Sequence, residues 1–182
     1  MLPQIPQIDL PFQPPSSRPF RKLKISVDPQ IQSEWCWAAV AAAINTSFGG
    51  PGSLTQCAIA SQVTGGECCD NGDSSVCNQP QDLKVVLTFL GFNVECTGAV
   101  SVEKLSDQVD KERAIPVRVR WSDGGAHFLL VTGVEDVPNP STIKDILVSD
   151  PIYGSGVCAF EDLQTNFLKN GGVWSNTYLT GN

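Results

Sequence analysis

The sequence is poor in several residue types, and each shortage limits what the protein can do. It has one histidine, one methionine and two tyrosines in 182 residues, so chemistry that needs an imidazole has a single candidate. Basic residues are outnumbered, 12 Lys and Arg against 19 Asp and Glu, and the net charge of -7 disfavours nucleic acid as a partner because phosphates are repelled. No apolar run approaches the roughly 18 residues that span a membrane, so we expect no membrane partner.

Prolines are concentrated at the start of the chain, where residues 1–20 hold six of the 13. This composition predicts an extended lead or linker. The lead also lacks the continuous apolar stretch of a secretory signal. We therefore expect one folded domain over residues 21–182, a size that can bury a sizeable core.

Helical patterns dominate the first half of this domain and strand patterns the second. The run CWAAVAAAINTSF, residues 36–48, lacks glycine and proline and stops at Gly49, which is typical of a buried helix. Further helices are expected at 55–63, 79–90, 102–112 and 162–169. Runs rich in Val, Ile and Leu or with alternating polarity predict strands at 21–27, 115–121, 128–135, 143–149 and 173–179. Helices followed by an antiparallel sheet indicate an α+β fold.

Cys36 lies where the alanine-rich helix is expected to begin. The thiolate, not the thiol, attacks carbonyls, so a nucleophilic cysteine needs help to ionise. Unpaired N–H groups at a helix start favour an anion there, and a nearby imidazolium would favour it more. A free cysteine is more often a small buried apolar residue. Trp35 and Trp37 weigh against that interpretation, because two tryptophans and a cysteine rarely meet by chance.

The segment QIQSEWCWAAVAAAI resembles the nucleophile region of papain-like cysteine proteases, particularly the bacterial branch that includes the avirulence proteases of plant pathogens. The resemblance implies a helical N-terminal half packed against a C-terminal antiparallel sheet, with the active site in the cleft between them. It also implies that the glutamine six residues before the cysteine, Gln30, donates to the oxyanion. Gln32 is the alternative, and either side chain could instead be a solvated loop amide.

Two later strings resemble the remaining triad elements of the same superfamily. GGAHFLLVTGV resembles the histidine motif, which makes His127 the base, and it opens an apolar strand beside a glycine turn. SDPIYG resembles the third element, an aspartate in the bacterial branch, so Asp150 would orient the imidazole. Asp150 could instead be a turn-forming Asp-Pro, and Asp145 matches the motif less well.

The other cysteines are Cys57, Cys68, Cys69, Cys77, Cys96 and Cys158. A zinc site is disfavoured, because no C-x2-C pair occurs and the adjacent Cys68 and Cys69 fit one tetrahedral site poorly. Four of the six fall in a run that resembles the cysteine-rich loop of secreted members of the bacterial branch. We therefore expect three disulfides with Cys36 left free, and no metal or cofactor.

Together these features predict a cysteine endopeptidase that cleaves proteins or peptides through an acyl-enzyme. We expect a monomer, secreted because disulfides form in oxidising compartments, or alternatively an effector delivered into the cytoplasm of a host cell. A transglutaminase or amidase would use the same triad on side-chain amides, and a binding module could keep the fold without activity. Processing of double-glycine leader peptides is less favoured, because the chain carries no membrane segment or ATPase.

Overall fold

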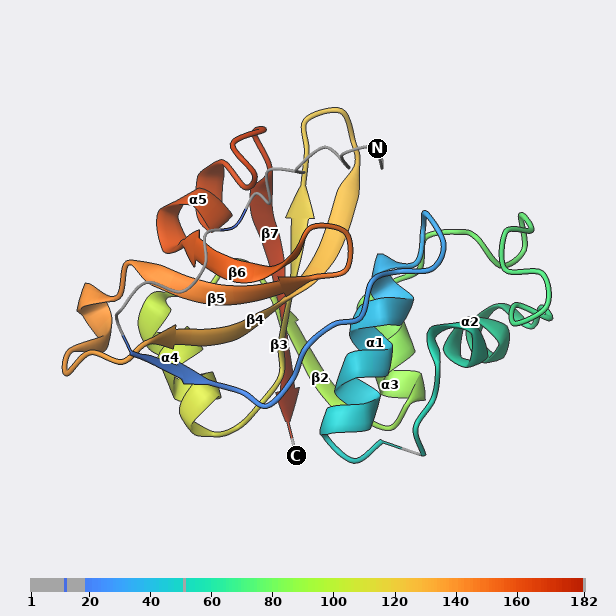
Figure 1. The fold of residues 1–182 in the computed structure, drawn as a ribbon, viewed down its shortest axis with the longest axis horizontal. Coiled ribbons are helices and arrows are strands. Elements are labelled where there is room, and N and C mark those ends of the chain that lie inside the picture. Colours follow the sequence, from blue (N-terminus) through green and yellow to red (C-terminus); the bar gives the residue numbers. More distant parts are fainter. Residues whose placement is uncertain (1–11, 13–18, 51, 182) are drawn as a thin grey trace, which may run out of the picture.

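The computed structural model describes residues 12, 19–50 and 52–181, so most of the predicted proline-rich lead lies outside the described residues. An antiparallel sheet forms the body of the fold, and helices cover both of its faces (Figure 1). The helices are α1 (Cys36–Ser47), α2 (Gln56–Thr64), α3 (Leu83–Phe89), α4 (Val102–Asp110), α5 (Phe160–Thr165) and the 3-10 turn η1 (Pro140–Thr142). The strands are β1 (Phe20–Lys22), β2 (Asn93–Thr97), β3 (Ile115–Arg120), β4 (Ala126–Glu135), β5 (Asp145–Asp150), β6 (Gly154–Ala159) and β7 (Val173–Gly181).

The strands follow the order β2-β7-β3-β4-β5-β6, with β1 paired to β4. Every pairing is antiparallel, which confirms the predicted α+β class. The central strand is β4, which pairs with β3 over its first half, with β5 over its second half and with β1 at its end.

The helical half consists of α1, α2 and α3, which pack together beside the sheet (Figure 1). Two of these helices begin at residues whose side chains satisfy free backbone N–H groups. Thr55 accepts from the Ala58 N–H at the start of α2, and Asp82 accepts from two N–H groups at the start of α3. Gly65, in the left-handed conformation, ends α2. Among the helices that the structure describes, none has the length and apolar character needed to cross a membrane.

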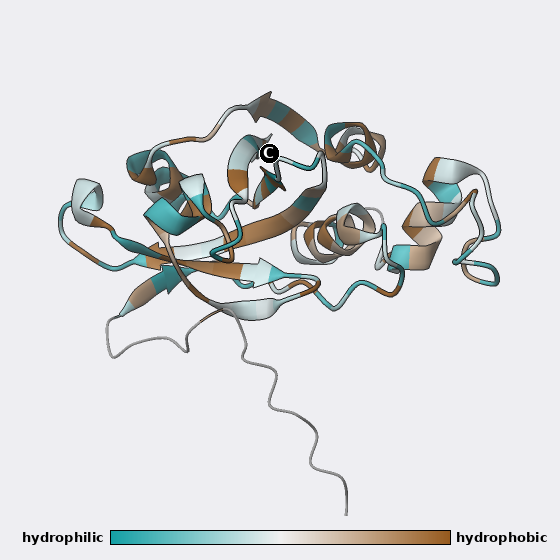
Figure 2. Cartoon of the chain, turned by 90° about the horizontal axis from the view of Figure 1, so that it is seen from above, coloured by the Kyte–Doolittle hydropathy of each residue, from teal (hydrophilic) through white to brown (hydrophobic). Residues whose placement is uncertain are grey.

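Strand β4 separates two hydrophobic cores because its successive side chains point to opposite faces. Phe128 and Leu130 belong to the core that α1 and α3 fill, whereas Leu129 and Val131 belong to the core that α4 and α5 fill. In Figure 2 the hydrophobic stretches accordingly run along the central strands and the helices packed on them. Burial on both faces explains why the sequence of this strand is almost continuously apolar.

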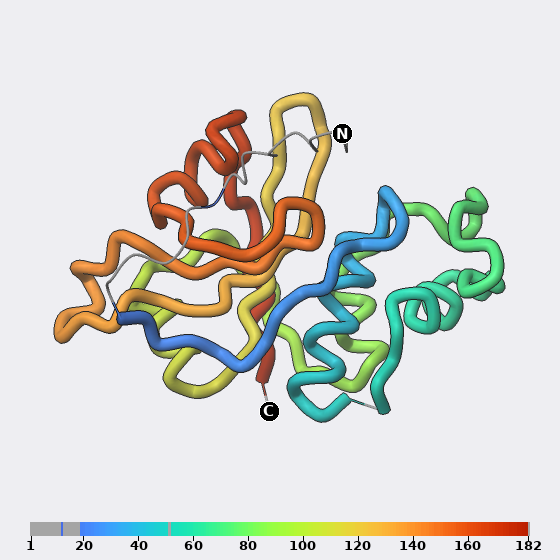
Figure 3. Tube along the Cα trace, viewed as in Figure 1, coloured from blue at the N-terminus to red at the C-terminus, as the bar shows by residue number. Residues whose placement is uncertain are grey.

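Gly133 lets β1 approach the end of β4. A Cβ atom at this position would lie 2.6 Å from the carbonyl oxygen of Arg21, so a larger residue would separate the two strands. From β1 the chain runs across the molecule to the start of α1 (Figure 3). The segment before Cys36 therefore connects the sheet half to the helical half.

Sequence patterns did not predict β2 and β6, which are the two edge strands of the sheet. In β2 only Val94 is buried, and β6 begins with glycines, so neither shows the apolar run of a central strand. The helix expected at 79–90 is shorter, because Asp82 starts it, and the helix expected at 162–169 covers Phe160–Thr165 instead.

The cysteines form two disulfides, Cys57–Cys69 and Cys68–Cys77, and the prediction of a third was wrong. Cys96 lies on β2 and Cys158 on β6, at opposite edges of the sheet and five strand spacings apart, roughly 24 Å. A disulfide requires Cα atoms within about 7 Å, so these two thiols cannot meet.

We expect the denatured protein, alkylated without reductant, to carry three adducts, at Cys36, Cys96 and Cys158. In the native protein Cys158 should resist alkylation, because burial and the neighbouring Asp162 raise the pKa of its thiol to about 12. Intact mass spectrometry under both conditions measures the counts. A count of one adduct in the denatured protein would show that a third disulfide forms. A count of seven would show that neither Cys57–Cys69 nor Cys68–Cys77 forms.

Candidate active site

Three side chains from three elements meet where two central strands of the sheet end. Cys36 is the first residue of α1, His127 the second residue of β4 and Asp150 the last residue of β5. Because β4 and β5 are antiparallel, the start of β4 and the end of β5 lie at the same end of this strand pair. His127 Nε2 lies 2.9 Å from Asp150 Oδ1, and Cys36 lies close enough to the same imidazole to help raise its pKa.

The carboxylate of Asp150 is fixed by the turn that follows β5. Its Oδ1 also accepts hydrogen bonds from the backbone N–H groups of Ile152, at 2.8 Å, and Tyr153, at 3.0 Å. The ring of Tyr153 lies edge-on to the imidazole of His127, with 6.1 Å between centroids. The alternative Asp145 begins β5, five residues and roughly 17 Å from its end, so it lies at the other end of the strand.

The environment of His127 favours the charged imidazolium. Burial alone would lower the pKa of this imidazole, since only 4% of the residue is exposed. Hydrogen bonds with Asp150 and Cys36, together with the charges of both groups, outweigh burial and raise the pKa from 6.5 to about 9. Since Nε2 faces Asp150, Nδ1 is the ring nitrogen left to exchange a proton with Cys36.

The start of α1 leaves its first backbone N–H groups open. The residue before the helix is Trp35, and no side chain caps the helix there. Cys36 is half-buried and lines a pocket of about 300 Å³ in which Phe128 and Tyr178 supply aromatic surface and Arg118 a cation. An anion on Cys36, or one that forms beside its N–H, therefore lies at the positive end of a helix.

Gln30 lies in the loop before α1, but its amide is already engaged. Its Nε2 donates to the carbonyls of Gln32, at 2.8 Å, and Ser33, at 2.7 Å. Its Oε1 is buried without a hydrogen-bond partner among the described residues. The side chain of the alternative Gln32 lies near Gly72, in the cysteine-rich loop. An oxyanion role for Gln30 therefore requires one of its two present hydrogen bonds to be exchanged.

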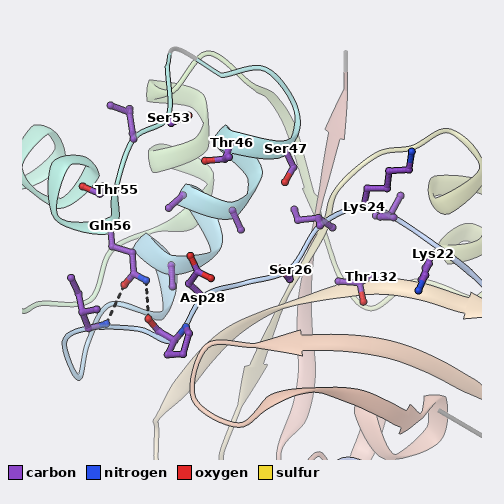
Figure 4. A pocket seen from close by; sticks show the side chains of 18 of the residues that line it. Lys22, Lys24, Ser26, Asp28, Thr46, Ser47, Ser53, Thr55, Gln56 and Thr132 are labelled. Atoms are coloured by element: carbon purple, nitrogen blue, oxygen red, sulfur yellow. Dashed lines mark hydrogen bonds between the residues drawn. The ribbon is translucent and has the colours of Figure 1, made fainter. Parts of the chain in front are cut away.

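Gln56 holds the same loop from the other side. Its Oε1 accepts from the Ile31 N–H at 3.1 Å, and its Nε2 donates to the Pro29 carbonyl at 2.9 Å (Figure 4). Both bonds lie at the end of a groove of about 960 Å³, larger than the pocket beside Cys36. The groove is lined mainly by the alanine-rich side of α1 and by residues 22–31, and none of the three clustered side chains lines it.

No group of three or more His, Cys, Asp and Glu side chains could hold a metal ion within residues 12, 19–50 and 52–181. The four cysteines considered for zinc are joined in the two disulfides.

Three residues that support the site were not predicted from the sequence. Gln56, Tyr153 and Asn78 contact the segments that carry the three clustered residues. Asn78 accepts from the Glu34 N–H at 2.9 Å. Their positions depend on how segments distant in the sequence pack together. The cluster of cysteines around Asn78 was the only local pattern that could have pointed to a supporting residue.

Solved structures of low sequence identity are similar to this chain. The peptidase domain of Streptococcus ComA, a bi-functional ABC transporter involved in a quorum sensing pathway, is 16% identical with a TM-score of 0.53; the match covers 87% of this chain and 99% of that one. A double glycine motif protease from an AMS/PCAT transporter, in complex with a leader peptide, is 18% identical with a TM-score of 0.49, and covers 88% and 94%. The Pseudomonas avirulence protein AvrPphB is 12% identical with a TM-score of 0.39, and covers 87% and 98%. No curated protein matches the chain significantly.

The fold is that of the papain-like peptidases, and the protein is a cysteine protease, a hydrolase. Within this class, the sequence profile of the family described as papain-like cysteine protease AvrRpt2 matches residues 19–164, more than half of the chain. The chain belongs to that family, which confirms the resemblance seen in the sequence.

Cys36→Ala should lower the pKa of His127 below the wild-type value of about 9, because the variant removes two of the interactions that raise it. A nuclear magnetic resonance titration measures this directly, since the chain has one histidine. Equal pKa values in the two proteins would contradict the contact between Cys36 and His127.

The raised pKa also makes stability depend on pH. A group whose pKa rises on folding stabilises the fold fully below its unfolded pKa, here 6.5, and loses that effect as the pH rises through about 9. Between these values the free energy of unfolding of the wild type should fall by about 3 kcal/mol more than that of His127→Ala. Denaturant unfolding at pH 6 and pH 9 compares the two.

Proposed function

We propose that Cys36, His127 and Asp150 are the catalytic triad of an endopeptidase that cleaves protein or peptide substrates. The observation that carries the proposal is one imidazole that is hydrogen-bonded to a buried carboxylate and lies close enough to a thiol at a helix start for that thiol to raise its pKa. This is the order of nucleophile, base and orienting group that acyl transfer requires.

In the proposed mechanism the thiolate of Cys36 attacks the carbonyl carbon of the scissile peptide bond. The N–H of Cys36, together with the amide of Gln30 once it exchanges a hydrogen bond, donates to the oxyanion. The imidazolium of His127 then protonates the leaving amine, and Asp150 keeps the ring oriented for this transfer. Water activated by the neutral imidazole hydrolyses the thioester and restores the thiol.

We further propose that the enzyme acts as a monomer after secretion. Two disulfides support an oxidising destination, because thiols in the cytosol are kept reduced. Delivery into a host cytoplasm, where the bridges would be exposed to reductants, is the alternative.

Cys36→Ala and His127→Ala should each lower kcat on a quenched peptide substrate by about 10⁴-fold or more, because each removes an indispensable part of one unit. Asp150→Asn should be milder than Asp150→Ala, since asparagine keeps the Oδ1 atom that accepts from His127, Ile152 and Tyr153. Wild-type turnover by either Cys36→Ala or His127→Ala would rule out the triad.

Mapping of new protein N-termini, with Cys36→Ala as the inactive control, identifies the substrates. Amine incorporation into glutamine side chains without new N-termini would make the protein a transglutaminase. If neither new N-termini nor incorporated amine were found, the protein would be a binding module without activity.

A further inference from the structure

The loop of residues 65–79, which we call the bridged loop, packs against the segment that carries Cys36. The disulfide Cys68–Cys77 lies within this loop, and Cys57–Cys69 ties it to α2. Cys68 and Cys77 are 2% and 1% exposed, and they share one hydrophobic core with Trp35 and Trp37, the two residues that flank Cys36. The inner disulfide is therefore part of the packing beside the nucleophile.

Both tryptophans donate hydrogen bonds to the bridged loop. Trp35 Nε1 donates to the carbonyl of Cys77 at 2.8 Å, and Trp37 Nε1 donates to the carbonyl of Gln79 at 3.0 Å. Both indoles are fully buried, so water cannot replace either partner. The backbone is thus held immediately before and immediately after Cys36.

Asn78, which lies between these two acceptors, holds the preceding residues. Its Oδ1 accepts from the Glu34 N–H at 2.9 Å, and its Nδ2 donates to Ser33 Oγ at 3.0 Å. Three consecutive residues of the bridged loop therefore hold four residues around the nucleophile, namely Ser33, Glu34, Trp35 and Trp37.

Two glycines of the loop lie in close contact with their surroundings. A Cβ atom on Gly72 would lie 2.8 Å from Gln32 Nε2 and 3.3 Å from the ring of Trp35. A Cβ atom on Gly66 would lie 2.9 Å from the sulfur of Cys77.

The start of α1 explains why such a support is useful. Helices usually begin at Ser, Thr, Asp or Asn, whose side chain accepts from N–H groups of the first turn. Trp35 occupies that position and makes no such bond, so the N–H groups stay open for the thiolate and the oxyanion. Without a cap, this end of the helix must be fixed from outside.

We propose that Trp35 and Trp37 are positioning residues that attach Cys36 to the bridged loop, and that the disulfide Cys68–Cys77 keeps this loop in place, so that its reduction lowers kcat. The proposal rests on Cys36 as the nucleophile. In the reduction, a thiolate of a small dithiol attacks one sulfur of the bridge and forms a mixed disulfide. The second thiol of the reagent then displaces the protein sulfur, which leaves two cysteine thiols and the oxidised, cyclic reagent.

Trp35→Phe and Asn78→Ala test the attachment, with kcat expressed per active site titrated by a peptidyl epoxide. Each should lower kcat about tenfold with little change in KM, and should slow the alkylation of Cys36 across the pH range. Trp174→Phe is the matched control. Its indole is also buried and donates to a backbone carbonyl, that of Asn176 at 2.9 Å, but it lies in the other core. A purely structural role would lower the melting temperature of all three variants and leave kcat per titrated site unchanged, which would overturn the proposal.

The disulfide is tested by Cys68→Ala/Cys77→Ala against Cys57→Ala/Cys69→Ala. The first pair should lower kcat per titrated site about tenfold, and the second should keep wild-type kcat. Dithiothreitol, which keeps Cys36 reduced, should lower the kcat of the wild type slowly and leave that of Cys68→Ala/Cys77→Ala unchanged. Equal losses in the two double variants, or wild-type kcat in the first, would overturn the role of the inner bridge.

If Cys36→Ala were fully active, the triad itself would fail, whereas an inactive Cys36→Ala beside a fully active Trp35→Phe would remove the positioning role alone.

Discussion

The confinement of β4 is the constraint on which the proposed active site depends. The strand is packed on both faces, and its first residues are hydrogen-bonded to β3, so they have little freedom to move. His127, the second residue of β4, is therefore held rigidly. The antiparallel neighbour β5 ends at Asp150, which lies at the same end of the strand pair. Cys36 arrives from the other half of the molecule on α1, whose packing against Phe128 and Leu130 sets the distance between thiol and imidazole.

The proposed nucleophile, Cys36, is correspondingly supported by both halves. On the sheet side, the Gln30 N–H donates to the carbonyl of Pro151, one residue after Asp150, at 3.0 Å. On the helical side, Gln56 and the bridged loop hold the residues before and after it. A shift of either half would therefore be transmitted to the position of Cys36, which connects catalysis to the packing of the entire domain.

The sequence was sufficient for the parts of the structure that local patterns encode. The alanine-rich helix, the apolar β4 and the motifs around Cys36, His127 and Asp150 were all visible, because buried helices and central strands need distinctive residues. The edge strands β2 and β6 were not, since one exposed face and one free edge impose little on composition. The disulfide pattern failed for another reason. An even count suggested three bridges, but whether Cys96 and Cys158 can meet depends on strand order, which no local pattern contains.

The free thiol that this strand order leaves on β2 has a consequence for chemical probes. Cys96 is exposed and lines the same pocket as Cys36, whereas Cys158 is buried. A peptide-like inhibitor whose side chain enters that pocket brings its substituent to a second sulfur nucleophile. A ligand with two electrophiles, one for each thiol, would be retained by two covalent bonds, and a papain-like enzyme without a cysteine at this place on β2 could form only one.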